Sequence, residues 1–321
     1  MTLDRSAPRQ DGPLIAAEAL AARLDDPHLR IIDTRWVLGR PGAGRIAYGT
    51  GHLPGAIFLD LDGDLALPPG PGRPGRHPLP HPAEFATRLG AVGIGSDHLV
   101  VAYDDVGGWV AARLWWMLDV LGHRRVAVLD AGLQGWLEAG LPLTAEVPRF
   151  PPTQIELSSA WTRVIDREHL KVRLGSVVLL DARAAARYRG EAEPIDAYPG
   201  HIPTARNAPT DGNLVAPDGR FLSPDALARR FRELEVDGGG GSDVVTSCGS
   251  GVSACHHALA MRLAGLPDPI LYEGSYSEWS AAGEPVAVGT APGSWPRASE
   301  RPVSRAIAGE RPDQKDPGGS R

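Results

Sequence analysis

The segment Ile31-Ile-Asp-Thr-Arg35 returns later in the chain as Leu179-Leu-Asp-Ala-Arg183, and this duplication decides the fold. Three further blocks repeat in the same order. They are Gly51-His-Leu-Pro-Gly-Ala56 with Gly200-His-Ile-Pro-Thr-Ala205, Val100-Val-Ala-Tyr-Asp104 with Val244-Val-Thr-Ser-Cys248, and Gly135-Trp-Leu-Glu-Ala-Gly140 with Glu278-Trp-Ser-Ala-Ala-Gly283. The offset is nearly constant at about 145 residues, far above the ~20–50 residues of a solenoid repeat, so the pattern predicts a duplicated domain.

Short apolar segments alternate with helical segments in each half. The expected strands are 29–34, 99–103 and 126–130 in the first half, and 177–181, 243–247 and 270–272 in the second. The expected helices include 109–121, where apolar residues recur at helical spacing, and 223–235, which begins with Ser-Pro-Asp, a typical helix start. This alternation predicts an α/β fold in which each domain is a parallel sheet flanked by helices.

Proline, glycine and charge mark the expected domain boundaries. We expect a flexible N-terminus over residues 1–12, a first domain over 13–142, a linker over 143–160, a second domain over 161–287 and a disordered tail over 288–321. The linker is rich in proline. The tail is rich in proline, glycine, serine and charge, a composition that does not support a packed core.

The composition excludes several classes of protein. The chain has 321 residues, a formal net charge of -6 and two cysteines. A nucleic-acid binder needs a basic face and a disulfide scaffold needs more cysteines, so neither is expected. The polar N-terminus does not resemble a signal peptide, and no apolar run approaches the ~20 residues that span a bilayer. We therefore expect a cytoplasmic protein with no membrane partner. We also expect a monomer.

The segment Val244-Val-Thr-Ser-Cys248-Gly-Ser-Gly-Val-Ser-Ala254 carries the candidate chemistry. A buried strand is expected to end just before Cys248, at the carboxyl edge of a parallel sheet, where such folds bind ligands. The small residues Gly249, Ser250 and Gly251 allow backbone N–H groups to form an anion-binding nest next to a helix N-terminus. These features favour a thiolate at Cys248. The alternative is that Cys248 is a buried cysteine with a purely structural role. We interpret Cys255, inside the following helix, in that way.

These blocks resemble the rhodanese-type sulfurtransferases with tandem domains, over residues ~15–287. The loop Cys248-Gly-Ser-Gly-Val-Ser-Ala254 is similar to the Cys-Gly-Ser-Gly-Val-Thr-Ala loop of the 3-mercaptopyruvate group, with Ser253 in place of Thr. The resemblance implies two rhodanese-like domains of which only the second is catalytic. The first-half position aligned with Cys248 is Asp104, which cannot carry a persulfide.

The resemblance also implies roles for further residues. Arg187 falls at the family's substrate-anion arginine, and the loop residues Gly249, Gly251, Val252 and Ser253 are expected to surround the substrate. Some members use a Ser–His–Asp relay, for which Ser250 and His52 would supply the serine and the histidine. The position expected for the relay aspartate is Pro41, and the position of a second family arginine is Asp196.

The function implied is sulfur transfer through a persulfide on Cys248. The expected donor is 3-mercaptopyruvate, and the expected acceptor is cyanide or a thiol such as thioredoxin, with no cofactor. Thiosulfate is the alternative donor, and a non-catalytic sulfur-binding module is a remote alternative. A cysteine phosphatase is unlikely because its Cys-x5-Arg motif would need arginine where this chain has Ala254.

No metal site is expected. Cys248, Cys255 and the adjacent His256 and His257 do not have the spacing of a zinc site, because neighbouring helical residues diverge by about 100°. The triplet Asp60, Asp62 and Asp64 superficially resembles a calcium loop but lacks the glycine and the glutamate that an EF-hand requires. We interpret these acids as solvated or capping residues.

Overall fold

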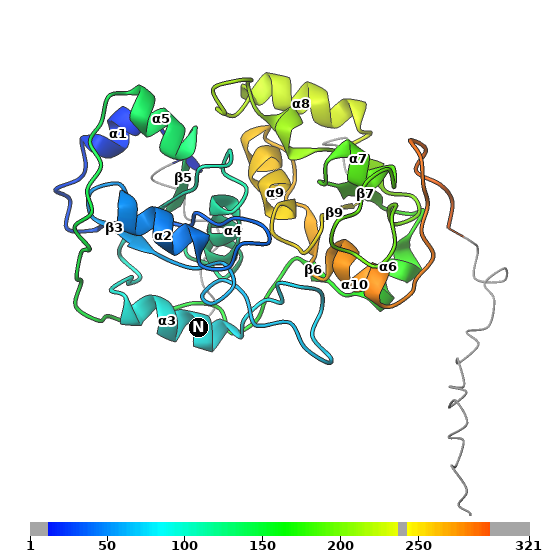
Figure 1. Cartoon of the computed structure of the whole chain (residues 1–321), viewed down its shortest axis with the longest axis horizontal. Coiled ribbons are helices and arrows are strands. Elements are labelled where there is room, and N and C mark those ends of the chain that lie inside the picture. The colour runs from blue at the N-terminus through cyan, green and yellow to red at the C-terminus, as the bar shows by residue number, and fades with distance from the viewer. Residues whose placement is uncertain (1–11, 237–242, 296–321) are drawn as a thin grey trace, which may run out of the picture.

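The computed structural model describes residues 12–236 and 243–295, which form two α/β domains side by side (Figure 1). Expectations for the N-terminus up to residue 11 and for the tail from residue 296 lie outside the described residues. Across the part described, no helix has both the length and the apolar character needed to cross a membrane. The predicted fold class, two parallel α/β domains, is confirmed.

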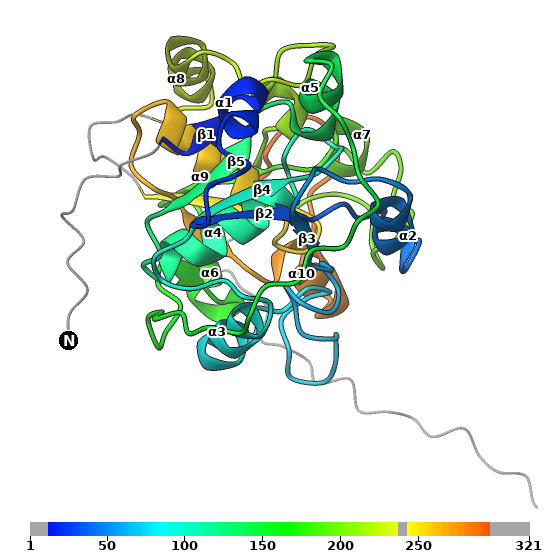
Figure 2. The same cartoon turned by 90° about the vertical axis from the view of Figure 1, so that its left-hand side faces the viewer.

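Each domain has a five-stranded, fully parallel sheet with the same strand order. In the first domain the elements are β1 (Leu14–Ile15), α1 (Ala17–Ala21), β2 (Leu29–Asp33), α2 (Ala43–Thr50), β3 (Ala56–Phe58), α3 (Pro82–Ala91), β4 (Leu99–Tyr103), α4 (Ala111–Val120), β5 (Val126–Leu129) and α5 (Gly132–Glu138). The sheet order is β1-β5-β4-β2-β3, visible end to end in Figure 2.

The second domain repeats this plan. Its elements are β6 (Val164–Ile165), α6 (Arg167–Arg173), β7 (Val178–Asp181), α7 (Ala185–Tyr188), β8 (Arg206–Asn207), the 3-10 helix η1 (Thr210–Asn213), α8 (Pro224–Glu233), β9 (Val244–Ser247), α9 (Ala254–Leu263), β10 (Ile270–Tyr272) and α10 (Ser275–Ala281). The order β6-β10-β9-β7-β8 matches the first sheet strand for strand. The six expected strands are found to within one residue. The sequence did not predict β1, β3, β6 and β8, because two or three residues are too few for a readable pattern.

The repeated motifs are structural in both halves. The Arg35 guanidinium pairs with Asp33 at 2.6 Å, and the Arg183 guanidinium pairs with Asp181 at 2.7 Å. In each case the same nitrogen donates to the carbonyl of the glycine before the repeated histidine, at 2.7 Å. The motif therefore ties the end of a central strand to the loop that begins with that glycine.

His52 belongs to this duplicated framework. Its ring stacks on Tyr48 with centroids 3.8 Å apart, and its nitrogens lie 2.8 Å from the Tyr48 carbonyl and 3.1 Å from the Glu146 carbonyl. In the second domain His201 stacks on Tyr188 in the same way, at 3.7 Å. Because both ring nitrogens of His52 contact backbone carbonyls, this side chain has no nitrogen left for a catalytic partner.

The segment after the second domain differs from the expected disordered tail over residues 288–295. The backbone of Ala287 pairs with that of His201, and the Ala291 carbonyl lies 3.1 Å from the His201 ring. Trp295 packs edge-on against Trp279, with ring centroids 5.5 Å apart. These contacts hold the segment against the second domain.

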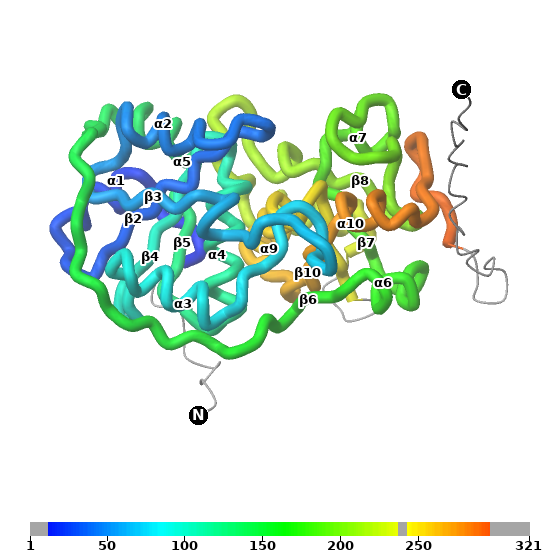
Figure 3. The backbone as a smooth tube through the Cα atoms, turned by 60° about the horizontal axis from the view of Figure 1, so that its bottom comes forward, coloured from blue at the N-terminus to red at the C-terminus, as the bar shows by residue number. Residues whose placement is uncertain are grey.

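The expected linker also packs, running along the outer edge of the first domain before it enters β6 (Figure 3). The Phe150 ring lies under the Arg30 guanidinium at 4.0 Å. The Thr153 amide donates to the Gly90 carbonyl at 2.9 Å. The proline-rich segment is therefore an extended connection that is bound to the first domain through side-chain and backbone contacts.

The two domains share one apolar core. Helix α4 of the first domain packs against α9 of the second in the middle of the molecule (Figure 1). Trp116 and Met117 from α4 and Leu259 from α9 belong to a single buried cluster. A polar contact adds to it, since the Phe221 amide donates to Asp130 at 2.9 Å. Burial of this kind of apolar area is the dominant favourable term in domain association, so the domains form one unit.

The loop after β4 in the first domain is a filled anion nest. The Asp104 carboxylate is fully buried and accepts four backbone N–H groups, from Val106, Gly108, Val110 and Ala111, at 2.8–3.0 Å. Asp104 occupies the position that Cys248 has in the repeat. The duplicated loop thus encloses the Asp104 carboxyl group through its own backbone donors. Burial raises the pKa of Asp104, and the four N–H groups oppose that rise.

We expect Asp104→Ala to lower the free energy of unfolding by roughly 2–4 kcal/mol, because four buried N–H groups lose their acceptor. Denaturant titration of the full chain measures this loss. Asp130→Ala, which removes a half-buried carboxylate bonded to one amide at the same sheet edge, is the milder control. Equal stability of Asp104→Ala and the parent chain would show that other groups satisfy the nest.

Candidate active site

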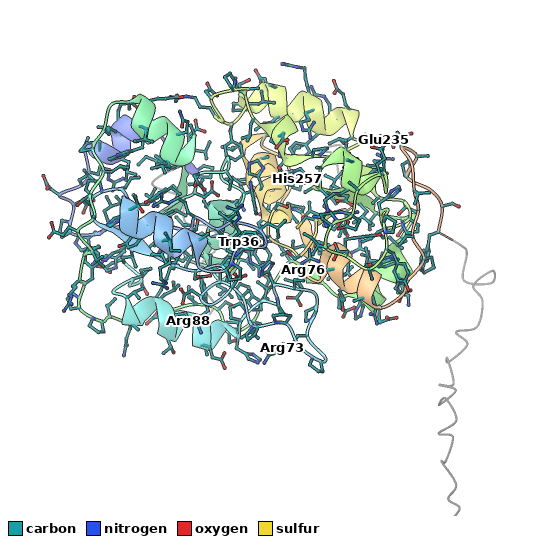
Figure 4. The ribbon with its side chains drawn as sticks, viewed as in Figure 1. Trp36, Arg73, Arg76, Arg88, Glu235 and His257 are labelled. Atoms are coloured by element: carbon teal, nitrogen blue, oxygen red, sulfur yellow. The ribbon has the colours of Figure 1, made fainter. Side chains whose placement is uncertain are left out.

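The candidate site lies where β9 ends at Ser247 and α9 begins at Ala254, as the sequence predicted. A pocket of about 210 Å³ opens there. Its lining includes Cys248, Gly249, Ser250, Val252 and Ser253 from this loop, Arg183 and Arg187 after β7, and Trp36, Arg76, His77 and Trp109 from the first domain. The pocket therefore lies between the domains, and Figure 4 shows Trp36 and Arg76 in this central position.

Cys248 lies at the base of this pocket. Its residue is 1% exposed, and the Gly251 amide donates to its Sγ at 3.1 Å. The start of α10 fixes the loop backbone, since the amides of Tyr276 and Ser277 donate to the carbonyls of Cys248 and Gly249, both at 2.9 Å. Backbone N–H donors of this kind stabilise a thiolate.

Gly251 allows the loop to turn beneath the sulfur. Its φ of 77° lies in the left-handed region, and a β-carbon there would lie 2.4 Å from the Glu273 carbonyl oxygen. Any other residue would push the loop away from β10 or rotate the amide that bonds Cys248. Both the positive φ and the lack of room for a β-carbon therefore require glycine at position 251, as expected for this loop.

A Ser–His–Asp arrangement lies next to Cys248, and it uses residues that the sequence analysis did not select. Ser250 Oγ lies 2.7 Å from Nδ1 of His77, and Nε2 of His77 lies 3.0 Å from Asp62. The hydrogen bond from His77 lowers the pKa of Asp62, while burial lowers the pKa of His77. At neutral pH His77 is therefore uncharged, with Nε2–H donating to Asp62 and Nδ1 accepting from the Ser250 hydroxyl.

The expectation that His52 partners Ser250 is wrong. His52 is fixed between backbone carbonyls of its own domain, whereas His77 bonds Ser250 directly. The acid that bonds His77 is Asp62, so proline at position 41 does not remove the acid from this arrangement. Asp62 also accepts from the indole N–H of Trp36 at 2.8 Å, which holds the carboxylate in place.

A sequence signal for His77 did exist. The two histidines of the Gly-His blocks occupy equivalent positions in the repeat, which indicates a structural role. His77 lies in a Pro- and Gly-rich segment, and the corresponding stretch of the second half has no histidine. A histidine that breaks the internal symmetry was therefore the better candidate.

A buried arginine from the first domain supports both halves of the site. Arg113 in α4 is completely buried, and its guanidinium donates to the carbonyls of Gly251 and His77, both at 3.0 Å. It thus contacts the cysteine loop on one side and the relay segment on the other. The positive charge also lies close to the loop that would carry a thiolate.

Arg187 lies at the pocket wall, at the end of α7. Its guanidinium contacts Glu193 at 2.7 Å and Asp196 at 2.9 Å. Although burial opposes ionisation, the hydrogen bond from Arg187 keeps the pKa of Glu193 below its usual value. Asp196 also pairs with Arg76 of the first domain, so a guanidinium is present even though the position of the second family arginine is an aspartate.

Cys255 is a core residue, as expected, and the two histidines that follow it are also buried. Cys255 is buried, burial raises the pKa of its thiol to about 12, and its Sγ donates to the Gly251 carbonyl at 3.4 Å. The Asn213 amide lies 3.1 Å from Nδ1 of His256 and 3.0 Å from Nδ1 of His257. Their Nε2 atoms contact backbone carbonyls, so these rings are not arranged as metal ligands.

Comparison with known proteins identifies the family. The rhodanese-like domain matches residues 16–139 and 166–282, and the chain belongs to this family. A Pseudomonas aeruginosa protein named "Probable 3-mercaptopyruvate sulfurtransferase" is 47% identical over 86% of this chain and 98% of its own length. The thiosulfate sulfurtransferase of Rattus norvegicus is 35% identical over 82% of this chain and 89% of its own.

The structure agrees with this assignment. The 3-mercaptopyruvate sulfurtransferase from Leishmania major superposes with a TM-score of 0.75 and 32% identity, over 86% of this chain and 76% of that one. The chain is therefore a sulfurtransferase with tandem rhodanese-like domains, as the resemblance implied.

We expect iodoacetamide at pH 8 to alkylate Cys248 and to spare Cys255. Cys248 lines the pocket, whereas the Cys255 thiol is buried and has a pKa of about 12. Peptide mapping of the full chain measures the modified residue. Cys248→Ser should abolish rapid labelling and Cys255→Ser should retain it; rapid labelling of Cys255 in the folded chain would contradict the assignment.

Proposed function

We propose that the chain moves sulfur from 3-mercaptopyruvate to a thiol acceptor through a persulfide on Cys248. The observation that carries the proposal is the position of Cys248 at the base of a pocket lined by Ser250 and His77, with Asp62 bonded to His77 behind them. The names of the relatives described above support the same donor class.

In the first step the Cys248 thiolate attacks the donor sulfur. The electron pair of the donor C–S bond moves onto carbon, which leaves as the enolate of pyruvate, and Cys248 keeps the sulfur as a persulfide. The enolate requires one proton. Water that enters the pocket supplies this proton through the Ser250 hydroxyl, which gives its own proton to the enolate carbon and regains one from the water. The hydroxide left behind takes up the proton that the Cys248 thiol released on ionising. His77 and Asp62 orient the Ser250 hydroxyl.

In the second step an acceptor thiolate attacks the outer sulfur of the persulfide. The S–S electron pair returns to Cys248 as a thiolate, and the acceptor leaves as a persulfide. Two displacements on one nucleophile predict ping-pong kinetics, and neither step needs an external oxidant or a cofactor. A small dithiol protein of the thioredoxin type in the cytoplasm is the acceptor that we propose, with the chain acting as a monomer.

Thiosulfate is the second candidate donor, since a relative of this chain bears that name. Its leaving group is sulfite, which departs without needing a proton, so the relay would have no task. The loop Gly249-Ser250-Gly251 also carries no charged side chain that would favour a dianion. Both features favour the carboxylate donor.

The proposal is tested by kcat/KM for 3-mercaptopyruvate and thiosulfate, measured side by side with cyanide as acceptor. We expect 3-mercaptopyruvate to be the better donor and intact-mass spectrometry to show one added sulfur on Cys248. Cys248→Ser should abolish transfer because a hydroxyl cannot form a persulfide, and Cys255→Ser should retain it. A preference for thiosulfate would refute the proposed donor, and sulfur on Cys255 would refute the nucleophile.

We expect Arg187→Ala to lower kcat/KM for 3-mercaptopyruvate by roughly 10- to 100-fold, because a charge-assisted hydrogen bond to the donor contributes ~1.5–3 kcal/mol. Arg187→Lys should rescue the activity only in part, since lysine lacks the planar fork. Arg189→Ala is the matched control: Arg189 is two residues away, pairs with Glu191 and does not line the pocket. A silent Arg187→Ala with a severe Arg189→Ala would show that the assigned arginine is wrong.

A further inference from the structure

Two guanidinium groups converge beside the Cys248 loop, and they come from different domains. We propose that Arg76, from the first domain, is the second anion-binding group of the donor pocket and acts with Arg187 on the donor carboxylate. This inference rests on the proposed function, because it assumes a donor that carries a carboxylate. It gives the non-catalytic domain a direct part in donor recognition.

The convergence is visible at Gly249, the residue after the nucleophile. A β-carbon at Gly249 would lie 3.0 Å from Nη2 of Arg76 and 3.5 Å from Nη1 of Arg187. Both arginines line the pocket that contains Cys248. These two nitrogens form no hydrogen bond with any residue of the described ranges, so they are the free donors at this wall.

Asp196 orients the two guanidinium groups. Its side chain is 3% exposed; one carboxylate oxygen pairs with Nη1 of Arg76, and the other lies 2.9 Å from Nη2 of Arg187. The carboxylate therefore holds each guanidinium by one nitrogen and leaves another nitrogen of each directed at Gly249. Other members of the family have an arginine where this chain has Asp196. Here Asp196 instead binds Arg76, an arginine that the first domain supplies.

The backbone around Arg76 is fixed against the second domain. The Arg76 amide donates to Ser277 Oγ in α10 at 3.1 Å, and a β-carbon at Gly75 would lie 2.5 Å from the Gly274 carbonyl oxygen. The Nε of Arg76 is buried and has no partner in the part of the chain described, so the ion pair with Asp196 leaves donors of this guanidinium unused. A side chain held this firmly loses little further freedom when it binds a ligand.

The charges at this wall indicate the kind of anion that fits. Arg76 and Arg187 are balanced by Glu193 and Asp196, so the four groups together carry no formal net charge. Because these charges cancel, the wall has no large net electrostatic field. Short-range hydrogen bonds from the two free nitrogens would then select the ligand. A planar monoanion such as a carboxylate matches two converging guanidinium groups better than a dianion does.

A pair of matched reagents tests Arg76 without relying on sulfur transfer. Iodoacetate and iodoacetamide both alkylate a thiolate and differ in carrying a carboxylate or a neutral amide. The measured quantity is the ratio of their rate constants at Cys248 in the full chain, with the site of labelling mapped by mass spectrometry. We expect Arg76→Ala to lower the iodoacetate-to-iodoacetamide ratio about three- to tenfold, the effect of one partly exposed charge–charge contact.

Three variants separate anion binding from a structural role. Arg73→Ala removes an exposed arginine of the same loop whose guanidinium donates to the Pro68 carbonyl, and it should leave the ratio unchanged (Figure 4). Asp196→Asn breaks the same ion pair as Arg76→Ala but keeps both guanidinium groups and one carbonyl acceptor to orient them, so the ratio should fall by less than in Arg76→Ala. Arg76→Lys keeps the charge without the fork and should give an intermediate ratio.

The outcomes are distinct. A ratio in Arg76→Ala within twofold of the parent chain, or an equal fall in Asp196→Asn, would overturn the role of Arg76 and leave it as an interdomain ion pair. In turnover assays the same Arg76→Ala should raise KM for 3-mercaptopyruvate more than it changes kcat. If the parent chain does not use this donor while the alkylation ratio still depends on Arg76, the proposed function fails and the anion site stands.

Discussion

The buried guanidinium of Arg113 is the interaction on which the site depends. It projects from α4 of the first domain to the carbonyl of Gly251 under the cysteine loop, and it also donates to the carbonyl of His77. A fully buried cation is expensive to place in a protein interior, and these two hydrogen bonds offset part of that cost, so they favour one relative position of the two segments. The nucleophile's loop and the relay histidine are thereby assembled around one group.

Duplication explains why the first domain has the same loop geometry as the second. In the first domain the nest after β4 holds the Asp104 carboxylate with four backbone N–H groups. In the second domain the corresponding loop presents a thiol, to which the Gly251 amide donates. The same backbone donors bind the Asp104 carboxyl group in one copy and are available to a sulfur atom in the other.

Divergence between the copies is concentrated in the segments that lack a repeat counterpart. His77 and Arg76 belong to a Pro- and Gly-rich loop of the first domain that reaches across to α10, where the Arg76 amide bonds Ser277. His52, by contrast, belongs to the duplicated framework, in which its ring supports a backbone turn. The prediction of His52 was wrong because it relied on the Gly-His block, which belongs to the repeated framework. The histidine that bonds Ser250 lies in a loop outside that block.

The sequence by itself determined the α/β class, the duplication, the main strands and the identity of Cys248 as the candidate nucleophile. These follow from local patterns: apolar strands, helix starts and a glycine loop at a strand end. Only the tertiary structure decided which histidine bonds Ser250, that Asp62 completes the relay and that Arg76 lies beside Arg187. Ser250 and His77, like Arg76 and Arg187, lie more than a hundred positions apart and meet because one domain packs on the other, so no spacing in a single sequence could reveal them. Asp62 and His77 belong to one loop-rich segment of the first domain, and no regular helical or strand spacing connects them in the sequence.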